Sequence, residues 1–229
     1  DLKSAASKIK KEYKVDVIII VKDLFKTENA FELYDDVKSL KIKPSILVNN
    51  AAQGQYGEFS ETDINRELEI INLNIASVVI LTKLFLKDML QRGDGGILNV
   101  SSVASHILGP LQSVYHASKA FVQSFTAAIR DEVKDTSITI TALLPGPTDT
   151  DFFAKADMLN AKNVVEGDLA DPAKVAMDGY NALIKGVDNV VSGTMNKVEV
   201  AISNLLPESM VAEMVHKQQK PIENKKNKK

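Results

Sequence analysis

Apolar residues in this chain fall into short runs that alternate with longer amphipathic stretches. The short runs have the length and residue types of buried strands, and the longer stretches carry apolar residues at helical spacing. Strands are predicted at the runs that begin at Val17, Ile46, Ile97 and Ile138, and helices over 29–40, 64–92 and 114–134. Alternating strands and helices are typical of an α/β fold built on a parallel sheet.

Smaller signals mark the ends of these elements. The helical stripe over residues 1–13 runs directly into the Val17 strand, and Gly93 ends the middle helix. Asp171 and Pro172 supply a cap and a first-turn proline for a further helix. Residues 193–200 are predicted as the last strand.

Composition limits the classes of function. The chain has 229 residues, of which 45% are hydrophobic and 25% charged, so one soluble globular domain over 1–220 is expected. A net charge of −2 gives no electrostatic case for nucleic acid as a partner. The chain has no cysteine, and His106, His116 and His216 are too scattered to suggest a metal site. No run approaches ~18 uninterrupted apolar residues, so a cytoplasmic protein without a membrane partner is expected.

The most informative chemistry lies in the third predicted helix. Tyr115 and Lys119 stand four residues apart and should leave one face of that helix, and Ser102 lies thirteen positions before Tyr115. A phenol has a pKa of about 10, and a nearby ammonium favours the phenolate, so the pair suits a general acid or base. The Ser102 hydroxyl could hydrogen-bond an oxygen on which charge develops. A lone Tyr-x-x-x-Lys pattern is common by chance and is more often a solvated helix face.

Further motifs accompany this pair. The second predicted strand ends in Asn49-Asn50-Ala51-Ala52, and the strand from Ile138 is followed by Pro145-Gly146-Pro147. In this order and spacing, residues 1 to about 200 resemble the short-chain dehydrogenase/reductase family of nicotinamide-dependent oxidoreductases. The resemblance implies a Rossmann-like, doubly wound parallel sheet in three α/β/α layers. It also implies NAD or NADP as cofactor, a small-molecule carbonyl or alcohol as substrate, and a homodimer or homotetramer.

The resemblance assigns a role to each catalytic candidate. Tyr115 is similar to the family's general acid/base, Lys119 to the residue that lowers its pKa and binds the nicotinamide ribose, and Ser102 to the hydroxyl that polarises the carbonyl. Asn74 is similar to the asparagine of the proton relay, with Asn72 as a rival. The implied reaction interconverts a carbonyl and an alcohol by hydride transfer. A non-catalytic regulator or cofactor sensor with the same fold is the alternative, and the intact acid/base set argues against it.

Cofactor contacts also follow from the resemblance. They are implied for Asp23, Leu24, Asn49, Ala51, Tyr115, Lys119, Pro145, Gly146, Thr148 and Thr150. Residues 151–171 follow the last of these loops and are predicted to form a substrate lid, with an ordinary surface helix pair as the alternative. His116 is expected at the surface or at the rim of the substrate site. Residues 221–229 are expected to form a disordered, lysine-rich tail.

One departure from the family pattern is serious. The family begins with a strand and a glycine-rich turn that holds the pyrophosphate, whereas the first glycine of this chain is Gly54. We therefore expect that the first two strands of the fold are absent, through truncation or because another chain supplies them. These strands lie between the third and fourth in a doubly wound sheet, so the Val17 strand should have no neighbour. The preference between NAD and NADP is set in the same region.

Overall fold

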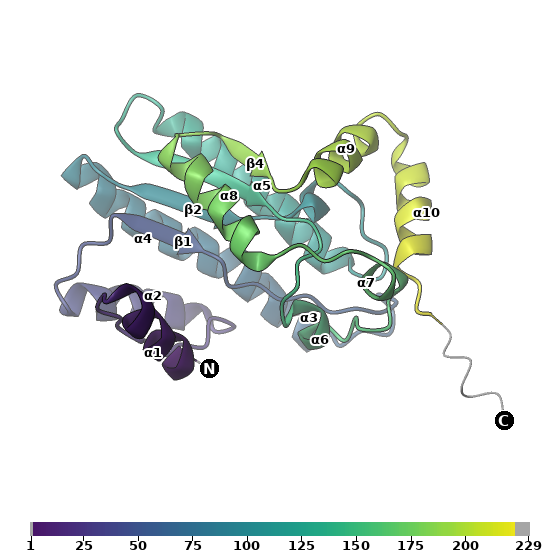
Figure 1. Ribbon diagram of the computed structural model, residues 1–229, viewed down its shortest axis with the longest axis horizontal. Coiled ribbons are helices and arrows are strands. Elements are labelled where there is room, and N and C mark those ends of the chain that lie inside the picture. Colours follow the sequence, from purple (N-terminus) through teal and green to yellow (C-terminus); the bar gives the residue numbers. More distant parts are fainter. Residues whose placement is uncertain (1, 223–229) are drawn as a thin grey trace.

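In the computed structural model, which describes residues 2–222, a parallel sheet lies between two layers of helices (Figure 1). The strands are β1 (Ile46–Asn49), β2 (Gly96–Val100), β3 (Thr139–Leu144) and β4 (Asn189–Val191). The helices are α1 (Leu2–Tyr13), α2 (Thr27–Ser39), α3 (Ile64–Ile71), α4 (Ser77–Arg92), α5 (Ser113–Glu132), α6 (Phe152–Lys155), α7 (Lys162–Val165), α8 (Pro172–Ile184), α9 (Thr194–Ser203) and α10 (Glu208–Gln219).

The sheet has the order β1-β2-β3-β4, and every pair of neighbours is parallel. Successive side chains along β2 enter different cores because side chains of a strand alternate between its faces. Ile97 packs with Phe85 and Met89 of α4, whereas Leu98 packs with Leu183 of α8. The predicted three-layer α/β/α architecture is therefore confirmed.

The predicted helix ends also agree with the structure. Gly93 ends α4 with φ 72°, a left-handed conformation that glycine adopts without steric cost. At the start of α8, the Asp171 side chain accepts a hydrogen bond from Ala173 N at 2.9 Å, and Pro172 occupies the first turn.

Two predicted strands are wrong. The Val17 run is irregular over residues 14–23, with Ile18 56% and Val21 77% exposed. A strand needs a neighbour for its backbone hydrogen bonds, and this run has none among the described residues. Lys22 instead ties the segment to α2 through ion pairs with Glu32 and Asp36. The second error is residues 193–200, which lie mostly in α9, while the last strand is the shorter β4 before them.

The helices α3 and α4 form one continuous stretch, Ile64–Arg92, joined by a turn of π-helix over Asn72–Ala76. By length and composition this stretch could cross a membrane. Its buried residues pack against the sheet and α2 in the main core. The expected absence of a membrane partner stays a prediction.

The predicted lid contains α6 and α7 and has a small core of its own. Phe153, Ala156, Met158 and Ala161 form its buried cluster. Within the predicted tail, Ile222 N donates to Asn160 O at 2.8 Å. Residues 223–229 lie outside the described residues.

Candidate active site

The carboxyl ends of β1, β2 and β3 lie at one edge of the sheet, and the loops that follow them border a cavity of about 870 Å³. Ligands of open parallel α/β sheets bind in the crevice at this edge. Eight of the residues predicted to bind cofactor or substrate line the cavity: Ala51, Ser102, Tyr115, Lys119, Pro145, Gly146, Thr148 and Thr150.

Tyr115 projects into this cavity from the first turn of α5, and its ring lies 4.9 Å from the ring of Phe152, centre to centre. Burial raises the pKa of Tyr115 to about 12, and a hydrogen bond with Ser102 acts in the opposite direction. The phenol is therefore protonated at neutral pH, which is the form that can donate a proton.

Lys119 lies one helical turn further along α5 and is 3% exposed. Its Nζ donates to the Val100 carbonyl at 2.8 Å and lies 5.8 Å from the centre of the Tyr115 ring. Burial lowers the pKa of Lys119 to about 8. Burial of the phenol is the largest influence on the pKa of Tyr115, and the expected lowering of that pKa by Lys119 stays a prediction.

Ser102 follows β2 and is held by the loop after β3. Its hydroxyl donates to Pro145 O at 3.3 Å and accepts from Ala104 N at 3.1 Å. A backbone hydrogen bond from Val103 N to Pro145 O, 2.9 Å, joins the same two loops. The position of the hydroxyl beside Tyr115 thus depends on β2 and β3 being neighbours.

The two rival asparagines of the π-helical turn point to different places. Asn74 is 1% exposed, and its Nδ2 donates to Gln53 O at 2.8 Å and to Ser118 Oγ at 2.9 Å. This arrangement links the loop after β1 to α5. Asn72 instead donates to Phe25 O at 3.2 Å, away from the cavity.

Three predicted cofactor residues do not line the cavity. Asn49 is buried on the other side of the sheet, where its Nδ2 donates to Thr82 Oγ1 at 2.9 Å and to Asn99 Oδ1 at 2.8 Å. The Asp23 side chain accepts from Phe25 N at 3.1 Å in a turn, and Leu24 packs on the main core. These side chains have structural partners in this structure.

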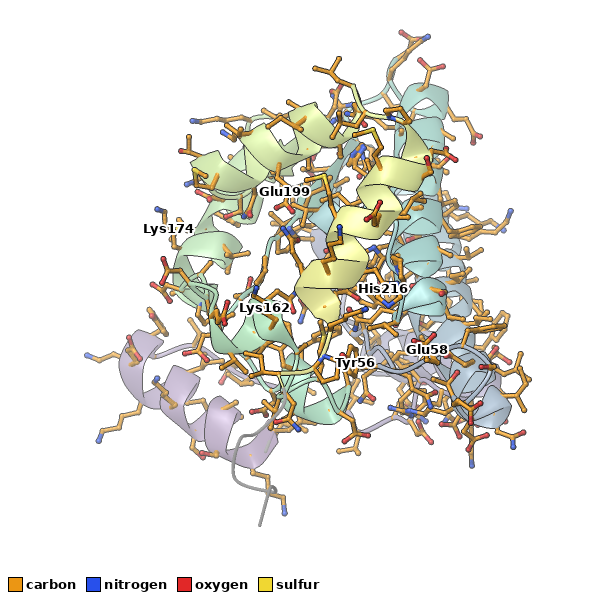
Figure 2. All side chains as sticks on the ribbon, turned by 90° about the vertical axis from the view of Figure 1, so that its right-hand side faces the viewer. Tyr56, Glu58, Lys162, Lys174, Glu199 and His216 are labelled. Atoms are coloured by element: carbon orange, nitrogen blue, oxygen red, sulfur yellow. The ribbon has the colours of Figure 1, made fainter. Side chains whose placement is uncertain are left out.

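Sequence reasoning did not find the wall of the cavity formed by α9 and α10. Glu199 of α9 and Gln219 of α10 line the cavity, and burial raises the pKa of Glu199. Figure 2 shows Tyr56 at the C-terminal end of α10, where its hydroxyl donates to the Gln219 carbonyl.

His116 also lines the cavity, in agreement with the expected rim position, and its Nδ1 lies 2.6 Å from Ile107 O.

A family model described as short chain dehydrogenase matches residues 1–160. The chain therefore belongs to the short-chain dehydrogenase family.

Several curated relatives support this membership. A very-long-chain 3-oxoacyl-CoA reductase of Anas platyrhynchos is 34% identical over 149 residues, which cover 63% of this chain and 47% of the relative. Dehydrogenase/reductase SDR family member 7B of Rattus norvegicus is 31% identical over 169 residues, which cover 71% of this chain and 48% of the relative. The ketoacyl reductase HetN of Nostoc is 26% identical over 203 residues, which cover 84% of this chain and 69% of the relative. The chain thus spans about half the length of the first two relatives.

Solved structures share the fold. A 7beta-hydroxysteroid dehydrogenase aligns with a TM-score of 0.81 at 20% identity, over 94% of this chain and 82% of that one. A short-chain dehydrogenase from Sphingobium yanoikuyae in complex with NADPH aligns with a TM-score of 0.77 at 21% identity, over 89% of this chain and 80% of that one.

Proposed function

We propose that this chain carries the catalytic centre of an NAD(P)-dependent oxidoreductase that reduces the carbonyl of a small molecule to an alcohol. The observation that carries the proposal is the meeting of Tyr115, Ser102 and Lys119 in one cavity at the carboxyl edge of a parallel sheet. The names of the relatives support the reaction class, since those given above are reductases or dehydrogenases.

The residues of the cavity fit the nicotinamide and ribose half of such a cofactor. Lys119 has three N–H donors, one of which is given to Val100 O, so it can also bind ribose hydroxyls. Thr148 and Thr150 offer hydroxyls beside Pro145 and Gly146. For the pyrophosphate, residues 2–49 contain no glycine and hence no glycine-rich turn. The described residues of the cavity therefore fit the nicotinamide and ribose half of the cofactor.

The proposed chemistry divides between cofactor and protein. A nicotinamide cofactor, held by Lys119 and the loop after β3, would supply the hydride for the carbonyl carbon. Ser102 turns its single O–H from Pro145 O to the carbonyl oxygen, and Tyr115 gives that oxygen its phenolic proton, so that the alcohol leaves neutral. The Lys119 ammonium favours the phenolate that remains. Asn74 holds Gln53 and Ser118 beside this centre and is a candidate for the proton relay.

Burial keeps the Tyr115 phenol protonated at neutral pH, which is the form that the reductive direction uses. With a pKa of about 12 the phenol is an acid at neutral pH, and alcohol oxidation would first require its deprotonation. We therefore expect reduction to be the faster direction near pH 7 and oxidation to rise with pH.

The replacement Tyr115→Phe tests the proposal. It removes the proton and keeps the ring, so turnover of a ketone with reduced nicotinamide should fall by about 10²–10⁴-fold. The absorbance of reduced nicotinamide measures the rate. Tyr34→Phe is the matched control, because Tyr34 donates to Asp88 and does not line the cavity. Near-normal turnover by Tyr115→Phe would reject the assigned role. Cofactor binding without turnover in the unaltered protein would favour the non-catalytic alternative.

A further inference from the structure

The C-terminal end of α10 is attached to two segments that lie far from it in the sequence. We call residues 219–222 the end segment. The Tyr56 hydroxyl, from the loop after β1, donates to Gln219 O. Backbone hydrogen bonds join the end segment to the start of α7, from Lys162 N to Lys220 O at 3.0 Å and from Ile222 N to Asn160 O at 2.8 Å. The end segment therefore connects the loop after β1 with the predicted lid, and Figure 2 shows Tyr56 and Lys162 close to the end of α10.

These contacts hold one wall of the cavity in place. Val215 and Gln219 of α10 line the cavity together with three residues of the predicted lid, Phe153, Met158 and Asn163. Because α10 and the lid border the same cavity, the separation between them sets how much room the cavity offers on this side.

The middle and the end of α10 are held in different ways. Val211 and Val215 pack in a buried apolar cluster with the turn that follows β2. The end segment is held by hydrogen bonds, and its Lys220 and Pro221 are exposed. Hydrogen bonds near an exposed chain end open at a lower free energy than a packed core does. The end segment can therefore separate from the lid while the rest of α10 stays packed.

A buried acceptor in the end segment also favours opening. The neutral His116 ring donates from Nδ1 to Ile107 O, so its Nε2 is an acceptor and the Gln219 atom 3.5 Å away is the amide nitrogen. Gln219 Oε1 is then left buried without a hydrogen-bond partner among the described residues. Such an atom costs free energy, and water can satisfy it once the end segment moves away from the lid. The closed arrangement is thus weakened by the same residue that Tyr56 holds.

We propose that Tyr56 is a positioning residue that keeps the end segment against the lid, so that large ketones bind only when this contact opens. Small ketones bind whether it is open or closed. This inference rests on the proposed reductase function and adds the part of the chain that limits substrate size. A ligand that needs the open form binds in proportion to the population of that form. Loss of one hydrogen bond should raise this population by about fivefold.

Hydrogen exchange of the protein without ligands measures the opening. The amides of Lys162 and Ile222 donate across the contact, so in Tyr56→Phe they should exchange about fivefold faster than in the unaltered protein. The amide of Val211 lies in the packed part of α10 and should exchange at an unchanged rate. Equal acceleration at all three amides would mean that the replacement loosens the whole helix and would overturn the proposal.

Two ketones with the same reacting ring measure the effect on substrate size. Cyclohexanone is the small ketone, and 4-phenylcyclohexanone adds bulk away from the carbonyl. In Tyr56→Phe the ratio of kcat/KM for the large ketone to that for the small one should rise by about fivefold, the same factor as the hydrogen exchange. A general loss of folded protein would lower both rates alike and leave the ratio unchanged. An unchanged ratio would overturn the proposal.

Tyr34→Phe is the matched control. It removes one tyrosine hydrogen bond, to Asp88, in a part of the chain that does not border the cavity. Neither the ratio of the two ketones nor the exchange of the Lys162 and Ile222 amides should change in this variant. A rise in both variants would show a general effect of losing a hydrogen bond and would overturn the role of Tyr56.

Binding without cofactor separates this proposal from the proposed function. NMR titrations of the two ketones need no reaction, and Tyr56→Phe should raise the affinity for 4-phenylcyclohexanone relative to cyclohexanone by the same factor. If neither ketone is reduced but this relative affinity rises together with the hydrogen exchange, the reductase function fails and the role of Tyr56 stands. If the relative affinity is unchanged, or neither ketone binds, the role of Tyr56 is rejected, whatever the activity.

Discussion

Two apolar runs of similar composition have opposite fates in this chain. Residues 17–21 and β1 (Ile46–Asn49) both have the sequence of a buried strand, yet the first is irregular and exposed while the second pairs with β2. The difference is the presence of a neighbour, because the backbone donors and acceptors of a buried strand are paired with those of an adjacent strand. The catalytic candidates sit on the paired strands and on α5. Asp23 and Leu24, two of the residues expected to contact the cofactor, follow the unpaired run.

This contrast divides the proposed cofactor site into two halves. On the paired side, Ser102 is held by loops after β2 and β3, and Tyr115 and Lys119 leave one helix. On the unpaired side, Asp23 and Leu24 make local contacts and do not reach the cavity. The residues proposed for acid/base chemistry are therefore positioned by paired strands and α5, whereas Asp23 and Leu24 are not.

The largest effect is expected at the paired side. Ser102→Ala removes the hydroxyl that would bind the carbonyl oxygen, and loss of one such donor lowers kcat by about 10²–10³-fold. Steady-state rates with a ketone and reduced nicotinamide measure the change. Ser113→Ala, an exposed serine at the start of α5, is the control and should be close to the unaltered protein. A Ser102→Ala protein with the same kcat would place the oxygen-binding group elsewhere.

A smaller effect concerns stability and pH. The pKa of Lys119 is lowered to about 8 by burial, so between pH 8 and about 10.5 the unfolded chain binds more protons and the free energy of unfolding rises with pH. At pH 7 the buried ammonium costs roughly 3 kcal/mol, of which Lys119→Met should recover a part, because the variant also loses the hydrogen bond to Val100 O. Denaturant titrations from pH 7 to 10 should show the variant as the more stable protein at pH 7, with a difference that shrinks as pH rises. A difference independent of pH would contradict the burial of a charged lysine.

The smallest effect is expected in the unpaired run. Ile18 is 56% exposed, so Ile18→Ala should change the free energy of unfolding by less than about 0.5 kcal/mol. The matched replacement Ile97→Ala, at a residue with no exposure in β2, should cost about 2–5 kcal/mol. Chemical denaturation of both variants of the 229-residue chain gives the two values. Equal losses would mean that the Val17 run packs as a strand in solution.

The strands β1, β2 and β3 and the helix with Tyr115 could be predicted because their periodicity is local. The last strand could not, since Asn189–Val191 is short and the alternation of Val198 with Val200 resembles a strand more than the helix it belongs to. Likewise, Gln219 lies about a hundred residues from Tyr115 in the chain and reaches the cavity only through the packing of α10. No local pattern in the sequence marks such a contact. The rise of the Tyr115 pKa could not be predicted either, because it depends on burial by residues far away in the chain.

The most direct test of the divided site compares reduced nicotinamide mononucleotide with the complete reduced dinucleotide on the same 229-residue chain. Both contain the half that Lys119 and the loop after β3 would bind, and they differ in the adenosine half. Fluorescence titration should give dissociation constants within about tenfold of each other, because a glycine-rich pyrophosphate turn at a helix N-terminus is what would favour the dinucleotide. Lys119→Met should weaken both. Binding of the dinucleotide hundreds of times more tightly than the mononucleotide would contradict the account.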